Sequence, residues 1–384
     1  MRRPRVLIVI GRALPAIGGS QVFYDALSRY LVTHGVEARI AAIDMPRETV
    51  APEQPYEVIY QPTLREAWSL TRWADTVHTM DFNYFWWSLA KLLGRRTVIV
   101  YHTAARICPK AMAWNGHEVC SFKTHWRQCL GCLHRERSWV ASAMKWISLP
   151  VKQRLADRSD RLVNISDYAG RAFGIPQSLT IVHGIDLDEF VPTTKPARDY
   201  FLFVGRLVQE KGGDVAVRAM AEYVRRGGRL PLRIVGEGPE RPKLERLTAE
   251  LGLQRIVIFE GSKVGEALSE RFQHARAVLL SVLWAETFGR VCLEAMACGA
   301  PVVASRIGAF EDTAAKAGLM FPPGDSAALA EHLIRLSNDG ALVASLSDRG
   351  IAFSKSFSLP TEMEQYLRLY QELTGGWQAD SSVN

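Results

Sequence analysis

Two glutamates lie eight positions apart in a stretch where ligand chemistry is possible. The stretch ETFGRVCLE runs from Glu286 to Glu294 and follows an apolar run, AVLLSV, at 277–282. A helix is expected to begin at Phe288-Gly289, and eight residues of helix advance a chain by about 12 Å. Two carboxylates at that separation can accept hydrogen bonds from hydroxyls at both ends of an extended ligand, such as the sugar and the ribose of a nucleotide sugar.

The backbone between the two glutamates is suited to an anion. The N–H groups of Thr287, Phe288 and Gly289 would open the helix, where unpaired donors and the positive end of the helix dipole favour a phosphate. A bare pair of glutamates on a surface helix is the ordinary alternative. The whole string, which continues as AMACGAPVVAS, favours a ligand site.

A second stretch places two cations at the end of an expected strand. FVGRLVQEKGGD at 203–214 contains Arg206 and Lys211, followed by two glycines and by Asp214 as the expected N-cap of a helix. Arginine can bind a phosphate through two hydrogen bonds and lysine acts as a point charge, so the pair suits a diphosphate. The alternative is a charged surface loop.

Three further features follow expected strands. IVGEGPE at 234–240 places Gly236 in a turn before a helix, where it would lie at the rim of the same site. Gly18 and Gly19 follow the first strand and would let the backbone approach an acceptor or a phosphate, unless they form a plain turn. His102, in VIVYHTAARICP, follows another strand, although a lone histidine is often only a buried polar residue.

The elements that must position these residues alternate between apolar strands and amphipathic helices. Near-continuous apolar runs between helices predict parallel sheets that are covered on both faces. The fold class is therefore α/β, with two Rossmann-like, doubly wound domains facing each other across a cleft, and ligands bind at the carboxyl ends of such strands. The expected strands are 5–10, 37–44, 75–80, 96–103 and 161–166, then 200–205, 232–238, 256–261, 277–282 and 301–305.

The chain is predicted to divide near the linker-like sequence FVPTTKPARD. Residues 1–192 would form a first domain, which carries four cysteines at about 106–135, and residues 193–359 would form a second domain. Residues 360–384 would form a last helix, packed back on the first domain, and a tail.

Positive charge is concentrated in the first half. Residues 1–190 hold 24 Lys and Arg against 17 Asp and Glu, whereas the remainder holds 23 of each, so the whole excess of +7 precedes residue 191. This half is either a solvated basic surface or a surface that meets an anionic partner such as phospholipid head groups, a lipid pyrophosphate or nucleic acid.

The motifs together resemble the signature of family-4 glycosyltransferases, which are retaining enzymes of the GT-B fold. ETFGRVCLEAMACGAPVVASRIGAFED is similar to their Glu-x7-Glu region, and FVGRLVQEKGGD is similar to their donor-phosphate loop. IVHGIDLDEFVP at 181–192 resembles the segment before their linker, with His183 in place of the usual asparagine. PAIGGSQVFYDALSRYLVTHG at 15–35 resembles their amino-terminal Gly-Gly loop.

The resemblance implies a role for each residue. Glu286 would contact the donor sugar, Glu294 the ribose, and Arg206 and Lys211 the departing nucleoside diphosphate, with His102 near the donor sugar. Transfer would occur on one face, with no catalytic metal. The donor would be a UDP- or GDP-sugar, and the acceptor a saccharide or a polyprenyl-diphosphate-linked one in exopolysaccharide, O-antigen or glycolipid assembly.

Four cysteines form a cluster in the first half. Cys108, Cys120, Cys129 and Cys132 fall within 25 residues, and the last two form a Cys-x2-Cys pair. Four thiolates in a reducing compartment predict a structural zinc ion, with His117, His125 and His134 as spare ligands and free or redox-active thiols as the alternative. A similar insertion occurs in a subset of the family that the chain resembles.

The expected location is cytoplasmic, with peripheral contact at the inner membrane. The apolar part of MRRPRVLIVIGR is too short for a signal peptide, so it is interpreted as a first strand. DFNYFWWSLAKLLGRR at 81–96 has the aromatic and basic residues of an interfacial helix on an anionic membrane, although its aromatics could instead be core residues.

Two other functions are alternatives to a glycosyltransferase. Another nucleotide-sugar enzyme of the same fold, such as an epimerase or a sucrose-synthase-like enzyme, would use the same motifs. A zinc module that binds nucleic acid would use the basic, cysteine-bearing half but would leave the Glu-x7-Glu and Arg/Lys stretches without a role, so no nucleic-acid partner is expected.

Overall fold

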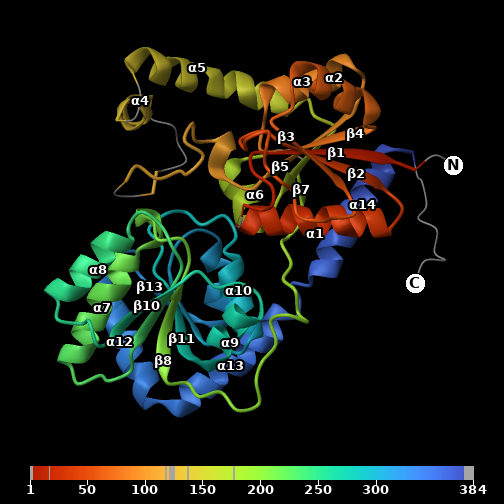
Figure 1. Ribbon diagram of the computed structural model, residues 1–384. Coiled ribbons are helices and arrows are strands. Elements are labelled where there is room, and N and C mark those ends of the chain that lie inside the picture. The colour runs from red at the N-terminus through yellow and green to blue at the C-terminus, as the bar shows by residue number, and fades with distance from the viewer. Residues whose placement is uncertain are drawn as a thin grey trace. The chain divides into compact units, whose positions relative to one another are not determined.

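The computed structural model describes residues 3–16, 18–116, 119–120, 126–135, 138–175 and 178–375. The chain divides into two compact units (Figure 1). Unit 1 comprises Met1–Met112, Phe122–Val182 and Pro360–Asn384, and unit 2 comprises Ala113–Ser121 and His183–Leu359. The division thus falls after Val182, ten residues before the boundary expected from the linker, and a short segment from the cysteine region belongs to unit 2.

Unit 1 is built on a parallel sheet of seven strands in the order β3-β2-β1-β4-β5-β6-β7. Its elements are β1 Arg5–Ile10, α1 Gly19–Thr33, β2 Glu37–Ala42, β3 Glu57–Tyr60, α2 Leu64–Trp73, β4 Thr76–Met80, α3 Tyr84–Leu92, β5 Arg96–Tyr101, η1 Ala104–Arg106, α4 Trp126–His134, α5 Trp139–Ala156, β6 Arg161–Asn164, α6 Asp167–Phe173, β7 Leu179–Thr180 and α14 Leu359–Leu373.

Unit 2 is built on a parallel sheet of six strands in the order β10-β9-β8-β11-β12-β13. Its elements are β8 Tyr200–Val204, η2 Gln209–Lys211, α7 Gly213–Arg225, β9 Leu232–Val235, α8 Arg241–Glu250, β10 Val257–Gly261, α9 Glu266–His274, β11 Ala275–Leu280, α10 Arg290–Ala297, β12 Val302–Ser305, η3 Gly308–Glu311, α11 Ala314–Ala317, β13 Leu319–Phe321, α12 Ser326–Asn338 and α13 Gly340–Ser354.

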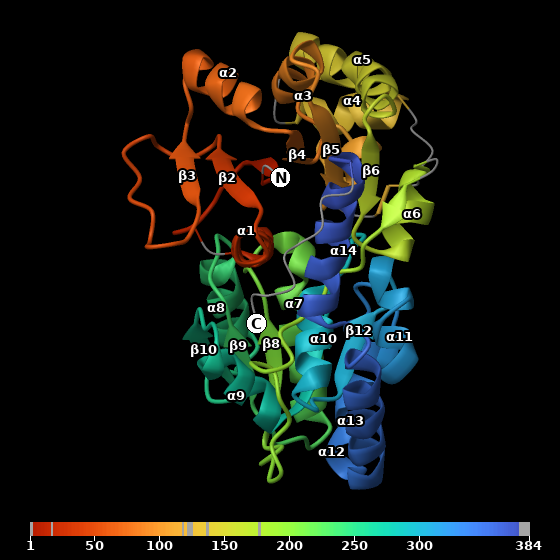
Figure 2. The ribbon, with the colours of Figure 1, turned by 90° about the vertical axis from the view of Figure 1, so that its right-hand side faces the viewer.

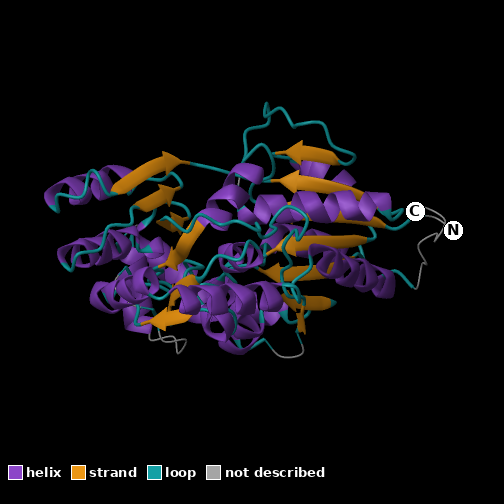
Figure 3. Cartoon of the chain, turned by 90° about the horizontal axis from the view of Figure 1, so that it is seen from below, coloured by secondary structure: helices purple, strands orange, loops and turns teal. Residues whose placement is uncertain are grey.

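The predicted fold class, two Rossmann-like units with parallel sheets, is confirmed. Helices pack beside the strands in each unit (Figure 3). The central strands are therefore buried on both faces, which their continuous apolar runs predicted. In β1, for example, every residue after Arg5 is buried. In unit 2, Phe201 and Leu279 of the sheet share one core with Met220 of α7 and Leu333 of α12.

Strand order determines where a ligand can bind. In each unit the order reverses beside the first strand, so β1 lies next to β4 and β8 lies next to β11. The loops that follow two such strands leave the same edge of the sheet in opposite directions and open a crevice. In unit 2 these are the loops that carry Arg206 and Lys211 after β8, and Glu286 after β11.

The last helix returns to the first unit (Figure 2). Its Tyr370 hydroxyl lies 2.5 Å from Nδ1 of His78 on β4, and both side chains are fully buried. No helix within the described residues is both long and apolar enough to cross a membrane.

The segment 81–96 contributes less to the surface than an interfacial helix would. Phe82 and Trp86 are buried, and Trp86 packs in the core of unit 1 with Leu7 and Val77. The interpretation of these two aromatics as membrane-facing is therefore wrong, because they cover the sheet. Phe85 of α3, whose ring contacts that of Trp86, is exposed.

Candidate functional site

In unit 2, hydrogen bonds join the loop after β8 to the loop after β11. These loops lie where the strand order of the sheet reverses, which we call the switch point. The backbone N–H of Leu283 donates to the carbonyl of Glu210 at 2.9 Å, and the hydroxyl of Ser281 donates to the carbonyl of Gly212 at 2.7 Å. Gly212 has a φ of +65°, and a Cβ there would lie 1.9 Å from the carbonyl oxygen of Ser281. A glycine is required for this close approach.

This approach brings together two of the predicted donor-binding residues. Nζ of Lys211 lies 2.5 Å from Oε2 of Glu286, and the indole Nε1 of Trp284 donates to the same oxygen at 3.2 Å. The Lys211 ammonium also lies 5.5 Å from the centre of the Trp284 ring. Glu286 is only 8 % exposed. A cation, Lys211, and a neutral donor, Trp284, hold its carboxylate in one place.

The backbone of Glu286 is fixed from the other side. Its carbonyl accepts a hydrogen bond of 2.8 Å from the N–H of Ala309. Gly308 has a φ of +63°, and a Cβ at that position would lie 2.5 Å from the Glu286 carbonyl oxygen. The string that follows the Glu-x7-Glu stretch, SRIGAF, therefore supports the first glutamate directly.

The second glutamate lies on α10 and is almost completely buried. Burial raises the pKa of Glu294, while Arg290, whose Nε lies 3.5 Å from Oε1, opposes the rise. Glu189, from the segment before β8, adds a second negative charge nearby, and its own pKa is raised by burial and by Asp186. Glu294 is thus a carboxylate with one cation and a like-charged neighbour.

The expected helix between the glutamates is shorter than predicted. α10 begins at Arg290 after Gly289, whose φ is +81°, so Glu286, Thr287 and Phe288 precede the helix. The rise of 12 Å that assumes a helix over the whole interval does not apply. Thr287 and Phe288 are buried. Gly289 has no room for a Cβ because the ring of Phe310 is 2.3 Å from that position.

The predicted phosphate loop is confirmed as a strand-to-helix connection, but its cap differs. Gly212, in the left-handed conformation, is the N-cap of α7, and Asp214 lies in the first turn. Arg206 is exposed and has no carboxylate within ion-pair distance among the residues that the structure describes. The loop therefore offers one free cation and one cation that is paired with Glu286.

Gly236 brings the loop after β9 against the loop after β8. Its φ is +144°, and a Cβ there would lie 1.9 Å from the carbonyl oxygen of Gly205. Gly238 is restricted in the same way by Leu207, whose N–H donates to Glu237 at 2.8 Å. Gly236 thus lies beside the loop predicted to bind phosphate, at the carboxyl edge of the sheet.

The predicted residues of unit 1 lie at the carboxyl edge of the other sheet. His102 follows β5 and is buried, and its Nε2 lies 2.9 Å from the hydroxyl of Tyr24. The same hydroxyl lies 3.2 Å from Nε2 of His78, which meets Tyr370 through its other nitrogen. Burial lowers the pKa of His78 to about 3, so this imidazole is neutral.

This network restricts the histidine tautomers. A single Tyr24 hydroxyl hydrogen can point to only one of the two imidazole nitrogens, so the other imidazole must donate to Tyr24. The protonation of His102 Nε2 is therefore linked to that of His78 and Tyr370. Gly18, the N-cap of α1, and Gly19, its first residue, begin the helix that carries Tyr24.

The described part of the chain does not place the cysteines as a metal site. No group of three or more His, Cys, Asp or Glu side chains among the described residues is arranged to hold a metal ion. All four cysteines are free thiols. Burial and the neighbouring Cys108 and Cys132 raise the pKa of Cys129, whereas Cys120 belongs to unit 2. His117 and His125 lie outside the described residues, and the donors that are described do not fit a zinc ion.

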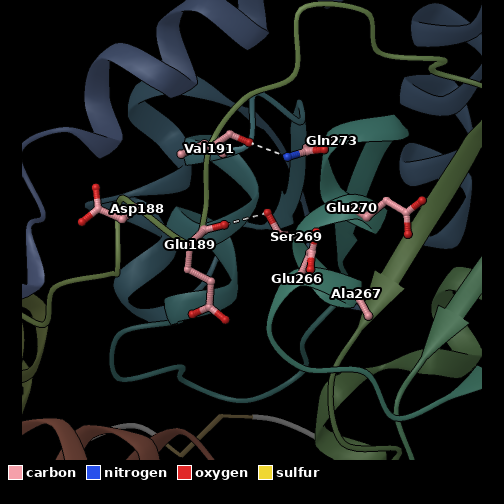
Figure 4. A pocket seen from close by; sticks show the side chains of 8 residues that line it. All are labelled: Asp188, Glu189, Val191, Glu266, Ala267, Ser269, Glu270 and Gln273. Atoms are coloured by element: carbon pink, nitrogen blue, oxygen red, sulfur yellow. Dashed lines mark hydrogen bonds between the residues drawn. The ribbon is translucent and has the colours of Figure 1, made fainter.

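A hollow of about 790 Å³ lies between the segment before β8 and helix α9 (Figure 4). Four carboxylates and four other side chains line it, and the hydroxyl of Ser269 and the amide of Gln273 donate to the carbonyls of Glu189 and Val191, both at 2.9 Å. None of the predicted donor-binding residues lines this hollow. Its lining consists of Asp188, Glu189, Val191, Glu266, Ala267, Ser269, Glu270 and Gln273.

Several residues of the site were not predicted. Trp284 lies two positions before Glu286, and Arg290 lies four before Glu294, so both were visible in the motif but had no assigned role. Tyr24 could not be identified because it meets His78 and His102 from 54 and 78 positions away. No pattern in the sequence indicates such a contact.

The chain is similar to known proteins. Residues 185–353 match the family model for glycosyl transferases group 1. A D-inositol 3-phosphate glycosyltransferase of Frankia alni is 27 % identical over 92 % of this chain and 94 % of its own length. Another, from Corynebacterium urealyticum, is 33 % identical, but the alignment spans only half of each chain.

A solved structure has the same fold along nearly the whole chain. The HepE protein of Anabaena in complex with UDP-glucose superposes with a TM-score of 0.73 and 17 % identity, and the match covers 96 % of this chain and 99 % of that one. The family model covers the sheet and helices that carry Glu286 and Glu294 and begins before β8. Residues 185–353, the greater part of unit 2, are therefore similar to the glycosyl transferases group 1 family.

Proposed function

We propose that this chain is a retaining glycosyltransferase that moves a sugar from a nucleotide-diphosphate sugar to a saccharide or lipid-linked acceptor. The observation that carries the proposal is the joint placement of Lys211 and Glu286 at the switch point of unit 2, 2.5 Å apart, with the exposed Arg206 in the same loop as Lys211. A cation pair and a fixed carboxylate suit the two ends of one ligand, a diphosphate and a polyhydroxyl sugar.

Donor binding would rearrange one ion pair. Without a donor, Lys211 neutralises Glu286. A diphosphate carries more charge than a carboxylate, so it would draw Lys211 away and join it to Arg206. Glu286 would then accept hydrogen bonds from sugar hydroxyls and keep its bond to Trp284. Glu294 would accept hydrogen bonds from the ribose.

The transfer step needs no protein nucleophile. The bond between the anomeric carbon and the diphosphate oxygen breaks, and the acceptor oxygen attacks the same face of the sugar. The acceptor proton passes to the departing diphosphate oxygen. Arg206 and Lys211 stabilise the negative charge that grows on this leaving group. His102 would lie near the donor sugar.

Relatives and structural neighbours support a nucleotide-sugar donor. The HepE structure of similar fold contains UDP-glucose, and two relatives are inositol-phosphate glycosyltransferases. We extend this to a UDP- or GDP-sugar donor. We place the acceptor in exopolysaccharide, O-antigen or glycolipid assembly, where a lipid-linked acceptor would be met at an anionic membrane surface.

A donor screen followed by product analysis tests the proposal. The protein is incubated with a panel of UDP-, GDP- and dTDP-sugars, and nucleotide release is measured with and without added saccharides. The anomeric configuration of the product is then determined by NMR. Retention of configuration with one donor supports the proposal. Inversion, or interconversion of the sugar without transfer, as an epimerase would give, contradicts it.

A further inference from the structure

Helix α5 exposes a continuous apolar stripe. Val140, Met144, Ile147 and Val151 are 70, 62, 61 and 48 % exposed, far more than large apolar side chains on an ordinary helix face. Their spacing of four, three and four positions places them on one side of the helix. Among the described residues, no element covers this side, and α5 lies at the edge of unit 1 (Figures 1 and 2).

The same side of α5 ends in positive charge. Arg154 continues the spacing of the stripe by three positions, and Arg158 follows two residues after the end of α5; both are exposed. Helix α3 is attached to α5, since the Tyr84 hydroxyl donates to the carbonyl of Ser148 at 2.9 Å. Lys91 and Arg95 lie near the end of α3.

The surroundings carry almost no free negative charge. Residues 84–96 and 139–161 contain eight Lys and Arg and only two acidic residues, Asp157 and Asp160. Asp157 is paired with Arg106 at 2.8 Å. Asp160 is paired with Lys91 and Arg96 at 2.7 and 2.9 Å, which hold the pKa of Asp160 well below its usual range.

We propose that the α5 stripe, defined as Val140, Met144, Ile147, Val151, Arg154 and Arg158, docks unit 1 on an anionic lipid bilayer. An apolar helix face with a basic end is the pattern of a helix that lies in a membrane interface, where the apolar side chains enter the acyl boundary and the cations meet anionic head groups. The basic end of the stripe favours anionic head groups over a second copy of the chain, which would offer this end no acidic counterpart from the two sequence segments around the stripe.

The proposed membrane contact does not depend on the transfer chemistry. It lies at 139–158 and replaces the contact at 81–96 that the sequence suggested. Two of the aromatics in 81–96 are core residues, whereas all four apolar residues of the α5 stripe are exposed. The stripe contains none of the residues assigned to donor binding. Membrane binding can therefore fail or succeed independently of catalysis.

Vesicle sedimentation tests the docking surface. The full chain is mixed with vesicles of phosphatidylcholine alone, or with about one third phosphatidylglycerol as the anionic lipid. We expect strong binding only to the anionic vesicles. The double variant Ile147→Glu/Val151→Glu should reduce binding at least tenfold, and Arg154→Gln/Arg158→Gln should abolish the preference for anionic lipid. Val50→Glu, at a loop residue that is 83 % exposed in the same unit, is the matched control and should bind like the wild type.

Folding and self-association are followed in the same samples. Circular dichroism shows whether each variant folds, and light scattering gives its mass. Unchanged vesicle binding by both folded double variants would overturn the proposal. A wild-type dimer that becomes a monomer in Ile147→Glu/Val151→Glu, together with no binding of the wild type to anionic vesicles, would also overturn it and identify the stripe as a contact between copies.

Discussion

Nζ of Lys211 lies 2.5 Å from Oε2 of Glu286, although the two residues are 75 positions apart and follow different strands. The contact exists because β8 and β11 are neighbours at the switch point of the unit 2 sheet. Both residues are proposed to bind the donor, so in the donor-free structure each occupies part of the other's ligand position. Donor binding then requires exchange of this ion pair.

Glu286→Gln should separate chemistry from nucleotide binding. The amide keeps the size of the side chain but loses the charge that holds sugar hydroxyls. We expect the turnover number to fall by about 100-fold or more, as for the loss of one preorganised polar group. The affinity for the free nucleoside diphosphate should stay the same or rise, because Lys211 is no longer engaged.

The control for this variant is Glu250→Gln, an exposed glutamate of α8 in the same unit. Steady-state kinetics give the turnover number, and calorimetry gives the nucleotide affinity. Near wild-type turnover of Glu286→Gln would contradict the role of Glu286 in holding the donor sugar.

Glu294 should make nucleotide binding sensitive to pH. Burial raises the pKa of this carboxyl, and its ionised form accepts hydrogen bonds from the ribose hydroxyls more strongly than its protonated form does. Nucleotide affinity should therefore weaken as the pH falls through the raised pKa. Because the ligand and neighbouring Glu189 also titrate, the test is the difference between the wild type and Glu294→Gln. Calorimetry over a pH series should show this difference shrinking at low pH, and a constant difference would contradict the role.

Tyr24→Phe should slow transfer without changing donor affinity. The substitution removes the hydroxyl that bridges Nε2 of His102 and Nε2 of His78, so both buried nitrogens lose a partner. We expect stability to fall by about 1–3 kcal/mol and the turnover number by about 3- to 10-fold, because His102 is no longer held in one tautomer.

Tyr366→Phe is the matched control, because the Tyr366 hydroxyl is buried in the same aromatic cluster and has no hydrogen-bond partner in the described structure. It should leave turnover unchanged. The pH profile of kcat/KM distinguishes a positioning role of Tyr24 from a packing role. Only a positioning role predicts a shift in the apparent pKa of this profile. Equal effects of Tyr24→Phe and Tyr366→Phe on turnover would show that Tyr24 only packs in the core.

Ionisation of Asp81, which follows β4, should lower the free energy of unfolding as the pH rises. Burial raises its pKa from 3.8 to about 6, against the opposing effects of Thr103 and Lys152. The folded chain thus holds this proton to a higher pH than the unfolded chain does. The contribution of Asp81 to the free energy of unfolding therefore falls between about pH 4 and pH 6.

Asp81→Asn should consequently be more stable than the wild type above pH 6, by about 1–3 kcal/mol, and equal to it near pH 4. Denaturant unfolding at several pH values measures this, with the exposed Asp348→Asn of α13 as the control. A variant that is less stable than the wild type at pH 7 would show that the charged form of Asp81 is favoured in the fold.

The sequence predicted the central strands well and the outer strands poorly. All ten expected strands are present, because buried parallel strands have continuous apolar runs. The three that were missed, β3, β7 and β13, are all edge strands of two to four residues. These three strands are too short to show the apolar run that identifies the others, whereas β10, the fourth edge strand, has five residues and was predicted.

The site was predictable where it depends on a local motif and not where it depends on topology. Arg206, Lys211, Glu286 and Glu294 could be selected as donor-binding candidates from their spacing and neighbours. The pairing of Lys211 with Glu286 could not, because it depends on which strands are adjacent. The Gly212 cap was also missed, since its left-handed conformation is set by the carbonyl of Ser281 in another loop.

The most direct test of the central claim is a calorimetric titration of UDP and GDP into the wild type, Arg206→Ala and Lys211→Ala. Arg229→Ala, at an exposed arginine of the same unit, is the control. We expect one nucleotide to bind the wild type and Arg229→Ala equally, and each of the other variants to lose about 10- to 100-fold in affinity, as for a lost charge-assisted hydrogen bond. Equal affinity of all four proteins, or binding of neither nucleotide to the wild type, would contradict the assignment of this site to the donor.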